Sequence, residues 1–169
     1  MKKLYIKQKV WGVGEKFTVM DEDSHPNYYV EGSFLKLPKE FRIKNNYGRQ
    51  IGTITKKVFS MLPKFYIEVS GKEPIILEKE FTLFKAKYLV VSKGIRIEGN
   101  LWDMNFSVYT CGKQVATIAK RWLSWGDTYE VTILDETMEE IVVALVVAID
   151  CVKAEEDAAA NTASDSYMY

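Results

Sequence analysis

The sequence contains little cysteine, histidine and proline. Cys111 and Cys151 are the only cysteines among 169 residues, and they form neither a CxxC motif nor another metal-ligand spacing. We therefore expect reduced thiols, as in a cytoplasmic protein, and no disulfide framework. His25 is the only histidine, so a catalytic triad or a histidine-ligated metal centre lacks its partners. We expect no cofactor and no metal ion.

Long apolar segments are also lacking. Near the start of the chain, Lys7, Gln8 and Lys9 interrupt the apolar residues, so we expect no signal peptide. The longest apolar run, residues 141–149, would rise about 14 Å as a helix, which is less than half of a hydrocarbon core of about 30 Å. We therefore expect no transmembrane span.

The formal net charge is zero, but the charges are unevenly distributed. Residues 1–133 carry 22 Lys and Arg against 14 Asp and Glu, whereas residues 134–169 carry 1 against 9. A basic body suggests an anionic partner. A solvated surface whose counter-charges lie on the acidic end explains the same pattern. We do not expect nucleic acid among the partners.

Short β-branched and aromatic runs, separated by turn residues, fill the first 133 positions. The runs that predict strands are residues 17–20, 28–30, 41–43, 65–69, 88–91, 106–109 and 129–133. Many short strands at about ten-residue spacing, with no helical pattern between them, favour an antiparallel sandwich or barrel.

An internal repeat links the two parts of this region. Residues 48–60 match residues 112–124 at six of thirteen positions. Two shorter matches stand upstream at a similar offset: residues 30–32 with 97–99, and residues 17–19 with 81–83. Two similar half-barrels, residues 1–69 and 70–133, that close on each other would explain the repeat and would leave no sheet edge exposed.

Residues 141–149 predict a helix that is buried inside the barrel. Thr137 and Glu140 have the spacing of a capping box, and Lys153 follows the run, as the helix dipole favours. A helix that is apolar on all sides but too short to span a membrane belongs to a protein core. The strands are the only enclosure that the sequence offers for it.

The composition changes again after this helix. From Ala154 onward the residues are mostly small or acidic. We expect residues 154–169 to form a disordered acidic tail. Residues 1–153 then form a single domain.

Several short motifs occur in an order that is typical of one family. They lie at residues 5–9, 16–19, 29–32, 97–99, 115–118, 125–129 and 147–150. In this order, together with the terminal apolar helix, they resemble the LURP-one-related family, whose bacterial branch is the YxjI-like proteins, within the tubby C-terminal-like superfamily. The resemblance covers residues 1–153. It implies a closed twelve-stranded antiparallel β-barrel around a C-terminal helix.

Two better-known branches of this superfamily suggest functions. Tubby domains bind phosphoinositides through basic side chains on the barrel exterior. Phospholipid scramblases add an acidic calcium segment and palmitoylated cysteines. Here residues 135–140 lack the length and the Asp, Asn and Gly pattern of a calcium loop, and the sequence has no cysteine cluster.

The resemblance therefore implies a non-enzymatic cytoplasmic domain, peripheral at the membrane, that binds anionic phospholipid headgroups or another polyanion. A scramblase-like membrane protein and a protein-interaction scaffold are the alternatives. We find no catalytic constellation in the sequence and do not expect an enzyme.

Basic side chains are the candidates for such a site. Two dyads occupy equivalent positions of the repeat, and only one member of each can face outward, because neighbours in a strand face opposite sides. Two further lysines, two positions apart, share one face of a predicted strand. The predicted lipid- or anion-binding residues are Lys56, Lys57, Lys85, Lys87, Lys120 and Arg121. The alternative is that these residues have no binding role and are ordinary solvent-exposed positions on the outer faces of strands, where lysine is common.

Three other features have both a functional and a structural interpretation. Asp150, at the end of the apolar run, is either a functional buried acid or a structural residue at the barrel mouth. Residues 21–23 either bind a cation or form an acidic hairpin turn. Residues 12–14 are a lone GxG without the strand–helix context of a nucleotide-binding loop.

Overall fold

Twelve β-strands and one long helix make up the part of the chain that the computed structural model describes, which is residues 1–9, 16–33, 38–57, 64–80, 87–90, 94–121 and 128–165. The strands are β1 (Lys2–Lys9), β2 (Lys16–Met20), β3 (Pro26–Ser33), β4 (Glu40–Asn45), β5 (Gln50–Lys56), β6 (Lys64–Val69), β7 (Ile75–Glu80), β8 (Lys87–Val90), β9 (Ile95–Asn100), β10 (Asn105–Thr110), β11 (Lys113–Arg121) and β12 (Thr128–Ile133). A short 3-10 helix, η1 (Glu136–Met138), leads into α1 (Glu139–Asp165).

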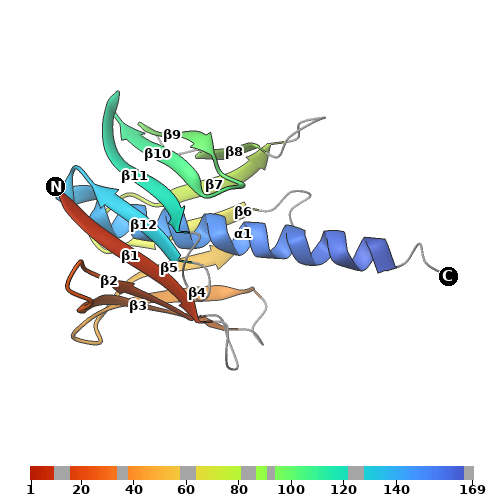
Figure 1. Cartoon of the computed structure of the whole chain (residues 1–169), viewed down its shortest axis with the longest axis horizontal. Helices are drawn as coiled ribbons and strands as arrows, with labels where there is room; N and C mark the ends of the chain where they lie inside the picture. The colour runs from red at the N-terminus through yellow and green to blue at the C-terminus, as the bar shows by residue number, and fades with distance from the viewer. Residues whose placement is uncertain are drawn as a thin grey trace.

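All twelve strands belong to one antiparallel sheet. Their order is β8-β7-β6-β5-β4-β3-β2-β1-β12-β11-β10-β9. The first and last strands of the chain pair with each other, with Lys2 opposite Ile133 and Ile6 opposite Tyr129. The sheet curves around α1, which runs through its middle (Figure 1). The expectation of a mainly β antiparallel fold with one C-terminal helix is confirmed.

The first part of α1 forms the centre of the hydrophobic core. Every residue from 141 to 152 is buried, and α1 packs against β5 and β6. Inward-facing residues of the strands alternate with outward ones, as in β12, where Tyr129, Val131 and Ile133 are fully buried. Since a helix satisfies its backbone hydrogen bonds internally, it can occupy this apolar interior. The predicted burial of residues 141–149 is confirmed.

The helix begins differently from the predicted capping box. Asp135 is the N-cap of η1, and its Oδ1 accepts hydrogen bonds from the Thr137 backbone N–H (3.0 Å) and hydroxyl (2.7 Å). Both hydrogen bonds lower the pKa of the Asp135 carboxyl below its ordinary value, and the bond from the Thr137 hydroxyl has the larger effect. Thr137 is therefore a donor to a cap and not the cap itself, because the chain forms a 3-10 turn before α1 starts at Glu139.

The internal repeat reappears in the pairing register. Gly52 lies opposite Val69 in the β5–β6 pair, and Ala116 lies opposite Ile133 in the β11–β12 pair. The hairpins β4–β5 and β10–β11 each have a register shift close to the turn. Matching residues therefore occupy matching positions in the sheet. The repeated segment at residues 81–83 lies outside the described residues.

The sheet is not closed by strand pairing in the described part of the chain. Its two outermost strands, β8 and β9, contact each other, but no described residues of these strands pair. The structure thus shows a twelve-stranded antiparallel sheet curved around a helix, and it does not confirm the closed barrel.

Antiparallel pairing gives this sheet two distinct ends. Odd-numbered strands end where even-numbered strands begin, and we call this side the exit end. The other side, where η1 and α1 begin next to the start of β1, is the opposite end. From the opposite end α1 runs across the sheet and continues beyond it at the exit end (Figure 1).

The last part of α1 extends away from the sheet. The backbone is helical through Asp165; residues 166–169, the end of the predicted acidic tail, lie outside the described residues. Alanine and glutamate, which favour helices, make up most of residues 154–160, so the buried helix can propagate into them. Among the described residues, no helix is both long enough and apolar enough to cross a membrane.

Replacing Val146 by Asp should prevent cooperative folding. Val146 is fully buried, and an unpaired buried carboxylate costs several kcal/mol against a total stability of about 5–15 kcal/mol. Ala154→Asp, at an exposed position of the same helix, is the matched control and should melt like the unmodified protein. Thermal unfolding followed by circular dichroism measures both, and a wild-type-like melt of Val146→Asp would contradict the burial of the helix.

Candidate anion-binding end of the sheet

The structure places the described candidate residues at one end of the sheet. Lys56 ends β5 and Lys57 follows it, while Lys120 and Arg121 end β11, so all four lie at the exit end. Lys87 is the first residue of β8 and belongs to the same end. The remaining candidate, Lys85, lies outside the described residues, as does the predicted GxG at residues 12–14.

The two members of each dyad have different environments. Lys56 lies opposite Phe65 and Lys120 lies opposite Tyr129, and both of these aromatic residues are buried. Because residues opposite each other in a sheet point to the same face, Lys56 and Lys120 point toward the inner face of the sheet. Each is the last inward-facing residue of its strand and is half-buried. The other members, Lys57 and Arg121, are exposed.

Arg121 also takes part in interactions along the outer face. Its Nη1 lies 2.9 Å from Oε2 of Glu130, and its guanidinium lies 5.8 Å from the ring centroid of Tyr5. The Nζ atom of Lys3 lies 3.5 Å from Oε1 of the same Glu130. Ion pairs of this exposed kind contribute little to stability, so Arg121 can exchange Glu130 for another anion at low cost.

The exit end carries an excess of positive charge. Twelve basic residues lie within three residues of a strand terminus there, or in the described positions adjoining it: Lys7, Lys9, Lys16, Lys39, Arg42, Lys56, Lys57, Lys64, Lys79, Lys87, Lys120 and Arg121. Seven acidic residues meet the same criterion: Glu31, Glu40, Glu78, Glu80, Glu98, Asp103 and Glu130.

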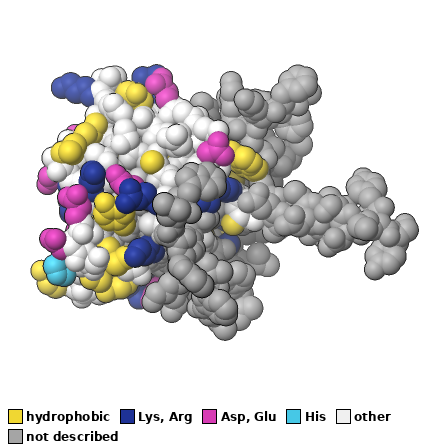
Figure 2. Space-filling view, in the orientation of Figure 1, with side chains coloured by type: hydrophobic (Ala, Val, Ile, Leu, Met, Phe, Trp, Pro, Cys, Tyr) yellow, Lys and Arg dark blue, Asp and Glu magenta, His cyan; other side chains and the backbone are white. Residues whose placement is uncertain are grey.

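The opposite end has the reverse balance. Its seven basic residues among those described are Lys2, Lys3, Lys44, Arg49, Lys72, Arg96 and Lys113. Its nine acidic residues are Asp21, Glu22, Asp23, Glu68, Glu73, Asp135, Glu136, Glu139 and Glu140. In Figure 2, Lys and Arg side chains lie across the middle of the face up to the grey residues, and several Asp and Glu side chains lie at the left margin. On the strand termini, positive charge is thus in excess at the exit end and negative charge at the opposite end, while α1 carries four further acidic residues, Glu155, Glu156, Asp157 and Asp165, past the exit end.

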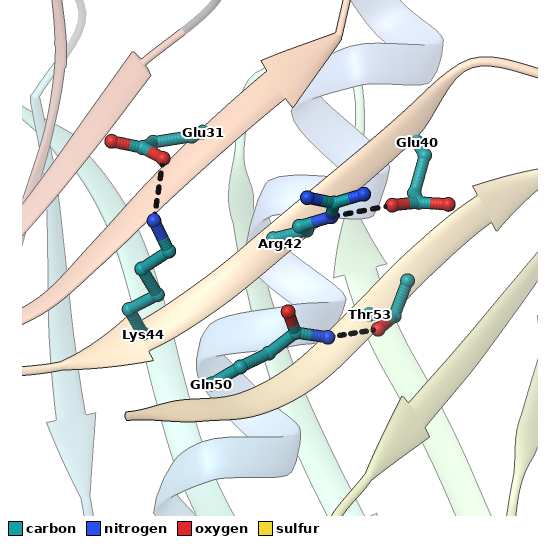
Figure 3. A network of polar contacts seen from close by, with 6 residues as sticks. All are labelled: Glu31, Glu40, Arg42, Lys44, Gln50 and Thr53. Atoms are coloured by element: carbon teal, nitrogen blue, oxygen red, sulfur yellow. Dashed lines mark hydrogen bonds and ion pairs between the residues drawn. The ribbon is translucent and has the colours of Figure 1, made fainter. Parts of the chain in front are cut away.

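Some of the basic residues in these two groups are paired on the outer face of the sheet. On β3 and β4, Lys44 donates to Glu31 (2.9 Å) and Arg42 donates to Glu40 (2.7 Å), as Figure 3 shows. In the described part of the chain, by contrast, neither Lys7 nor Lys57 makes an ion pair, and both are exposed. These two lysines are therefore available to an external anion.

Two polar contacts hold α1 within the sheet. At the opposite end, Glu139 is buried, and its Oε1 accepts hydrogen bonds from Lys2 Nζ and from the Tyr28 hydroxyl, each at 2.8 Å. Burial, followed by the Glu139 hydrogen bond and charge, raises the pKa of Tyr28 above its ordinary value. Nearer the exit end, the Tyr129 hydroxyl donates to the buried Asp150. The carboxylates thus connect the helix to β1, β3 and β12.

These contacts were only partly foreseen from the sequence. Asp150 is buried as one interpretation required, and it accepts a hydrogen bond from Tyr129, which the sequence analysis placed only in a predicted strand. Nothing in the sequence pattern pointed to Glu139 with Lys2 and Tyr28, because the three residues are far apart in the chain. Only their charge and polarity could have suggested a pairing.

The acidic segment at residues 21–23 forms a turn at the opposite end. The Oδ1 atom of Asp21 accepts hydrogen bonds from the backbone N–H of Asp23 (3.0 Å) and His25 (2.8 Å). Asp21, Asp23 and His25 also place potential ligand atoms within 4.8 Å of one another. The hydrogen bonds are those of an Asx turn, which is the structural interpretation of this segment.

The fold and its two ends define the class of protein: a curved antiparallel sheet of twelve strands built around a buried C-terminal helix. The sequence model of the LURP-one-related family matches residues 2–150, so the chain belongs to that family. The resemblance inferred from the short motifs is confirmed.

Two known proteins are similar to this chain. The uncharacterized protein YxjI of Bacillus subtilis (strain 168) is 31% identical over 153 residues, which is 90% of this chain and 94% of that protein. The X-ray structure of a protein from Arabidopsis thaliana is similar with a TM-score of 0.57 and 12% sequence identity, over 88% of this chain and 92% of that one. At this low identity the second similarity shows the fold alone.

The Tyr28–Glu139 contact predicts a pH dependence of stability. Folding raises the pKa of the Tyr28 hydroxyl, so this contact stabilises the folded state fully when the pH is below about 10, the pKa of tyrosine in the unfolded chain. The stabilisation is lost as the pH rises through the higher pKa that Tyr28 has in the folded state. Tyr28→Phe removes the hydrogen bond and should cost about 1 kcal/mol at neutral pH. Urea unfolding at about pH 8 and about pH 11 should show that wild type loses more stability than Tyr28→Phe. Equal losses would contradict the prediction.

Proposed function

We propose that this chain is a non-enzymatic, tubby-like domain that binds anionic phospholipid headgroups through the exit end of its sheet. The observation that carries the proposal is the concentration of basic residues at that end, with Lys7 and Lys57 exposed there. Anionic lipids on the cytoplasmic leaflet attract such basic surfaces. The domain would therefore act at the cytoplasmic face of a membrane as a peripheral protein.

The expected affinity is modest and depends on salt. Each lysine near an anionic membrane surface contributes about 1 kcal/mol, and salt screens the attraction within about 8 Å at physiological ionic strength. Several such residues at one end of a rigid sheet act together. A multivalent headgroup such as a phosphoinositide would gain more from them than a singly charged one.

The internal repeat supports a closed barrel as the finer description of the fold. Strands β3–β4–β5 and β9–β10–β11 have the same order and antiparallel pairing, so β8 and β9 take the places of β2 and β3, which pair over five positions of β2 from Lys16 to Met20. The contact between β8 and β9 lies at this one break in the sheet. A closed barrel would arrange the basic residues of the exit end around α1.

The burial of α1 argues against the scramblase-like alternative. Residues 141–152 form the core, so inserting them into a membrane would require the sheet to open and lose its hydrophobic centre. A protein-interaction scaffold remains the function to test if no anionic lipid binds.

Charge reversal at the exit end should weaken vesicle binding. Lys7→Glu combined with Lys57→Glu should reduce binding to vesicles containing phosphatidylserine or phosphatidylinositol 4,5-bisphosphate by roughly 30-fold or more, because two contacts of about 1 kcal/mol become repulsive. Binding of the unmodified protein should be detectable by co-sedimentation at low salt and largely lost by about 0.5 M salt.

The matched control places the same charge change at the opposite end. Arg49 and Lys72 are exposed, and Arg49→Glu combined with Lys72→Glu should leave vesicle binding within a few-fold of wild type. If both double variants weaken binding equally, net charge and not the exit end is responsible. If the folded wild type binds no anionic vesicle at low salt, the proposed function is wrong.

Removing residues 154–169 should strengthen the same binding. This segment carries four carboxylates in the sequence, and α1 leaves the sheet at the exit end, so these charges repel the membrane that the basic residues attract. The melting temperature should change little, since the buried part of α1 ends at Val152. Weaker vesicle binding by the shortened protein would show that the segment contributes to the site.

A further inference from the structure

Three side chains at the exit end lie in one row across neighbouring strands. Thr128, the first residue of β12, lies opposite Lys7 of β1 on one side and opposite Arg121 of β11 on the other. Residues that are opposite each other in a sheet share a face, and neighbours along a strand alternate between faces. Because the next residue, Tyr129, is fully buried on the inner face, Lys7, Thr128 and Arg121 belong to the outer face. We call these three residues the outer row.

The middle residue of the outer row has a buried hydroxyl. Thr128 is 4% exposed, although it belongs to the outer face. Its Oγ1 atom is buried and has no hydrogen-bond partner in the described part of the chain. Most buried polar groups in folded proteins have a partner, so an exception needs a physical explanation. A hydroxyl in this state can donate a hydrogen bond to a ligand that the chain itself does not contain.

The Arg121 side chain reaches over the strand that carries this hydroxyl. Arg121 ends β11, and its guanidinium lies 5.8 Å from the ring centroid of Tyr5 on β1. Since β12 separates these two strands, the guanidinium and the ring meet over β12. There Nη1 lies 2.9 Å from Oε2 of Glu130, the next outward residue of β12. A guanidinium has five N–H donors in a planar fork, so Arg121 can contact Glu130 and bind an oxyanion as well.

Lys7 supplies a second positive charge to the outer row. It is exposed, and among the described residues it has no ion-pair partner. Glu130, the one acidic residue in the β12 sequence, contacts both Lys3 and Arg121. Together with Lys7, these two basic residues place three positive charges against one negative charge on adjacent strands. The surroundings of the Thr128 hydroxyl therefore favour an anion.

The arrangement of the outer row fits a phosphate monoester. Adjacent strands lie about 5 Å apart, so the Lys7 and Arg121 backbones are about 10 Å apart, and their long side chains can converge on one group above Thr128. A phosphate monoester carries a charge of about −1.5 to −2 at neutral pH and three acceptor oxygens. It can therefore accept from an ammonium, a guanidinium and a hydroxyl at once. A carboxylate carries one negative charge on two oxygens, and it matches this set of donors less well.

We propose that Lys7, Thr128 and Arg121 form a binding site for a phosphate monoester. Lys7 and Arg121 bind the charged oxygens, and the Thr128 hydroxyl donates to a further oxygen. The inference deepens the proposed function and rests on it for the source of the ligand, a lipid headgroup. A phosphoinositide carries phosphate monoesters, whereas the phosphate of phosphatidylserine is a diester. The site would therefore distinguish between two anionic lipids.

Thr128→Val tests the site without changing any charge. We expect inositol trisphosphate, a soluble headgroup with monoester phosphates, to bind the unmodified protein at one site in isothermal titration calorimetry at low salt. The variant should bind it roughly 10-fold or more weakly, because a hydrogen bond to a charged group is lost. Without ligand the variant should melt no lower than wild type, since the hydroxyl that it lacks has no described partner in the protein.

Thr132→Val is the matched control. Thr132 lies two positions further along β12 on the same face, opposite Lys3 and Thr117, and is half-buried. Its replacement should leave the affinity for inositol trisphosphate unchanged. Arg121→Gln, at an exposed position, is an independent second variant and should also weaken binding. If Thr128→Val does not fold, an unchanged affinity of Arg121→Gln would still show that the site is wrong.

Vesicle co-sedimentation identifies the source of the monoester. At low salt, Thr128→Val should weaken binding to vesicles that contain phosphatidylinositol 4,5-bisphosphate. It should not weaken binding to phosphatidylserine vesicles of the same surface charge, because attraction between net charges does not depend on the hydroxyl.

The outcomes separate this inference from the proposed function. If wild type binds both kinds of vesicle and Thr128→Val binds them and inositol trisphosphate equally well, the site is wrong while the proposed function stands. If inositol trisphosphate binds through Thr128 but no anionic vesicle binds, the site stands for a soluble monoester and the proposed function is wrong. If neither the vesicles nor inositol trisphosphate bind the folded protein, both are wrong.

Discussion

The burial of one apolar helix is the constraint on which the rest of the structure depends. Residues 141–152 have no exposed face, so the sheet has to surround them, and twelve strands curve far enough to do so. Two acidic residues of this helix, Glu139 and Asp150, each accept hydrogen bonds from side chains of the sheet, Glu139 from β1 and β3 and Asp150 from β12. These hydrogen bonds reduce the free-energy cost of burying the two acidic residues, since a buried carboxylate without a partner is strongly destabilising.

Antiparallel connectivity then sorts the connecting segments between two ends. Each strand reverses the direction of the chain, so successive connections alternate between the exit end and the opposite end. In this chain the alternation coincides with a difference in charge, with lysine-rich strand termini at the exit end and acidic turns at the opposite end. Basic residues that are far apart in the sequence are therefore brought to one end of the sheet.

Strongly periodic or repeated segments could be identified from the sequence. The repeat at residues 48–60 and 112–124 predicted two similar halves, and the hairpins β4–β5 and β10–β11 have register shifts at equivalent places. The strands β1, β5, β7, β9 and β11 were not among the predicted strands; in β7 and β9, charged residues dilute the β-branched pattern. The disorder expected from Ala154 onward rested on composition alone. Once the buried part of α1 has nucleated the helix, each further residue adds a hydrogen bond at little cost, and the backbone remains helical to Asp165.

The sequence by itself determined the fold class, the buried helix and the family, because hydrophobic periodicity and motif order are local properties of the chain. It also identified the basic dyads. Only the tertiary structure decided that Lys57 and Arg121 are exposed while Lys56 and Lys120 continue inward-facing rows, because strand register assigns each side chain to a face. The gathering of basic residues at the exit end likewise depends on strand direction, which single segments do not encode.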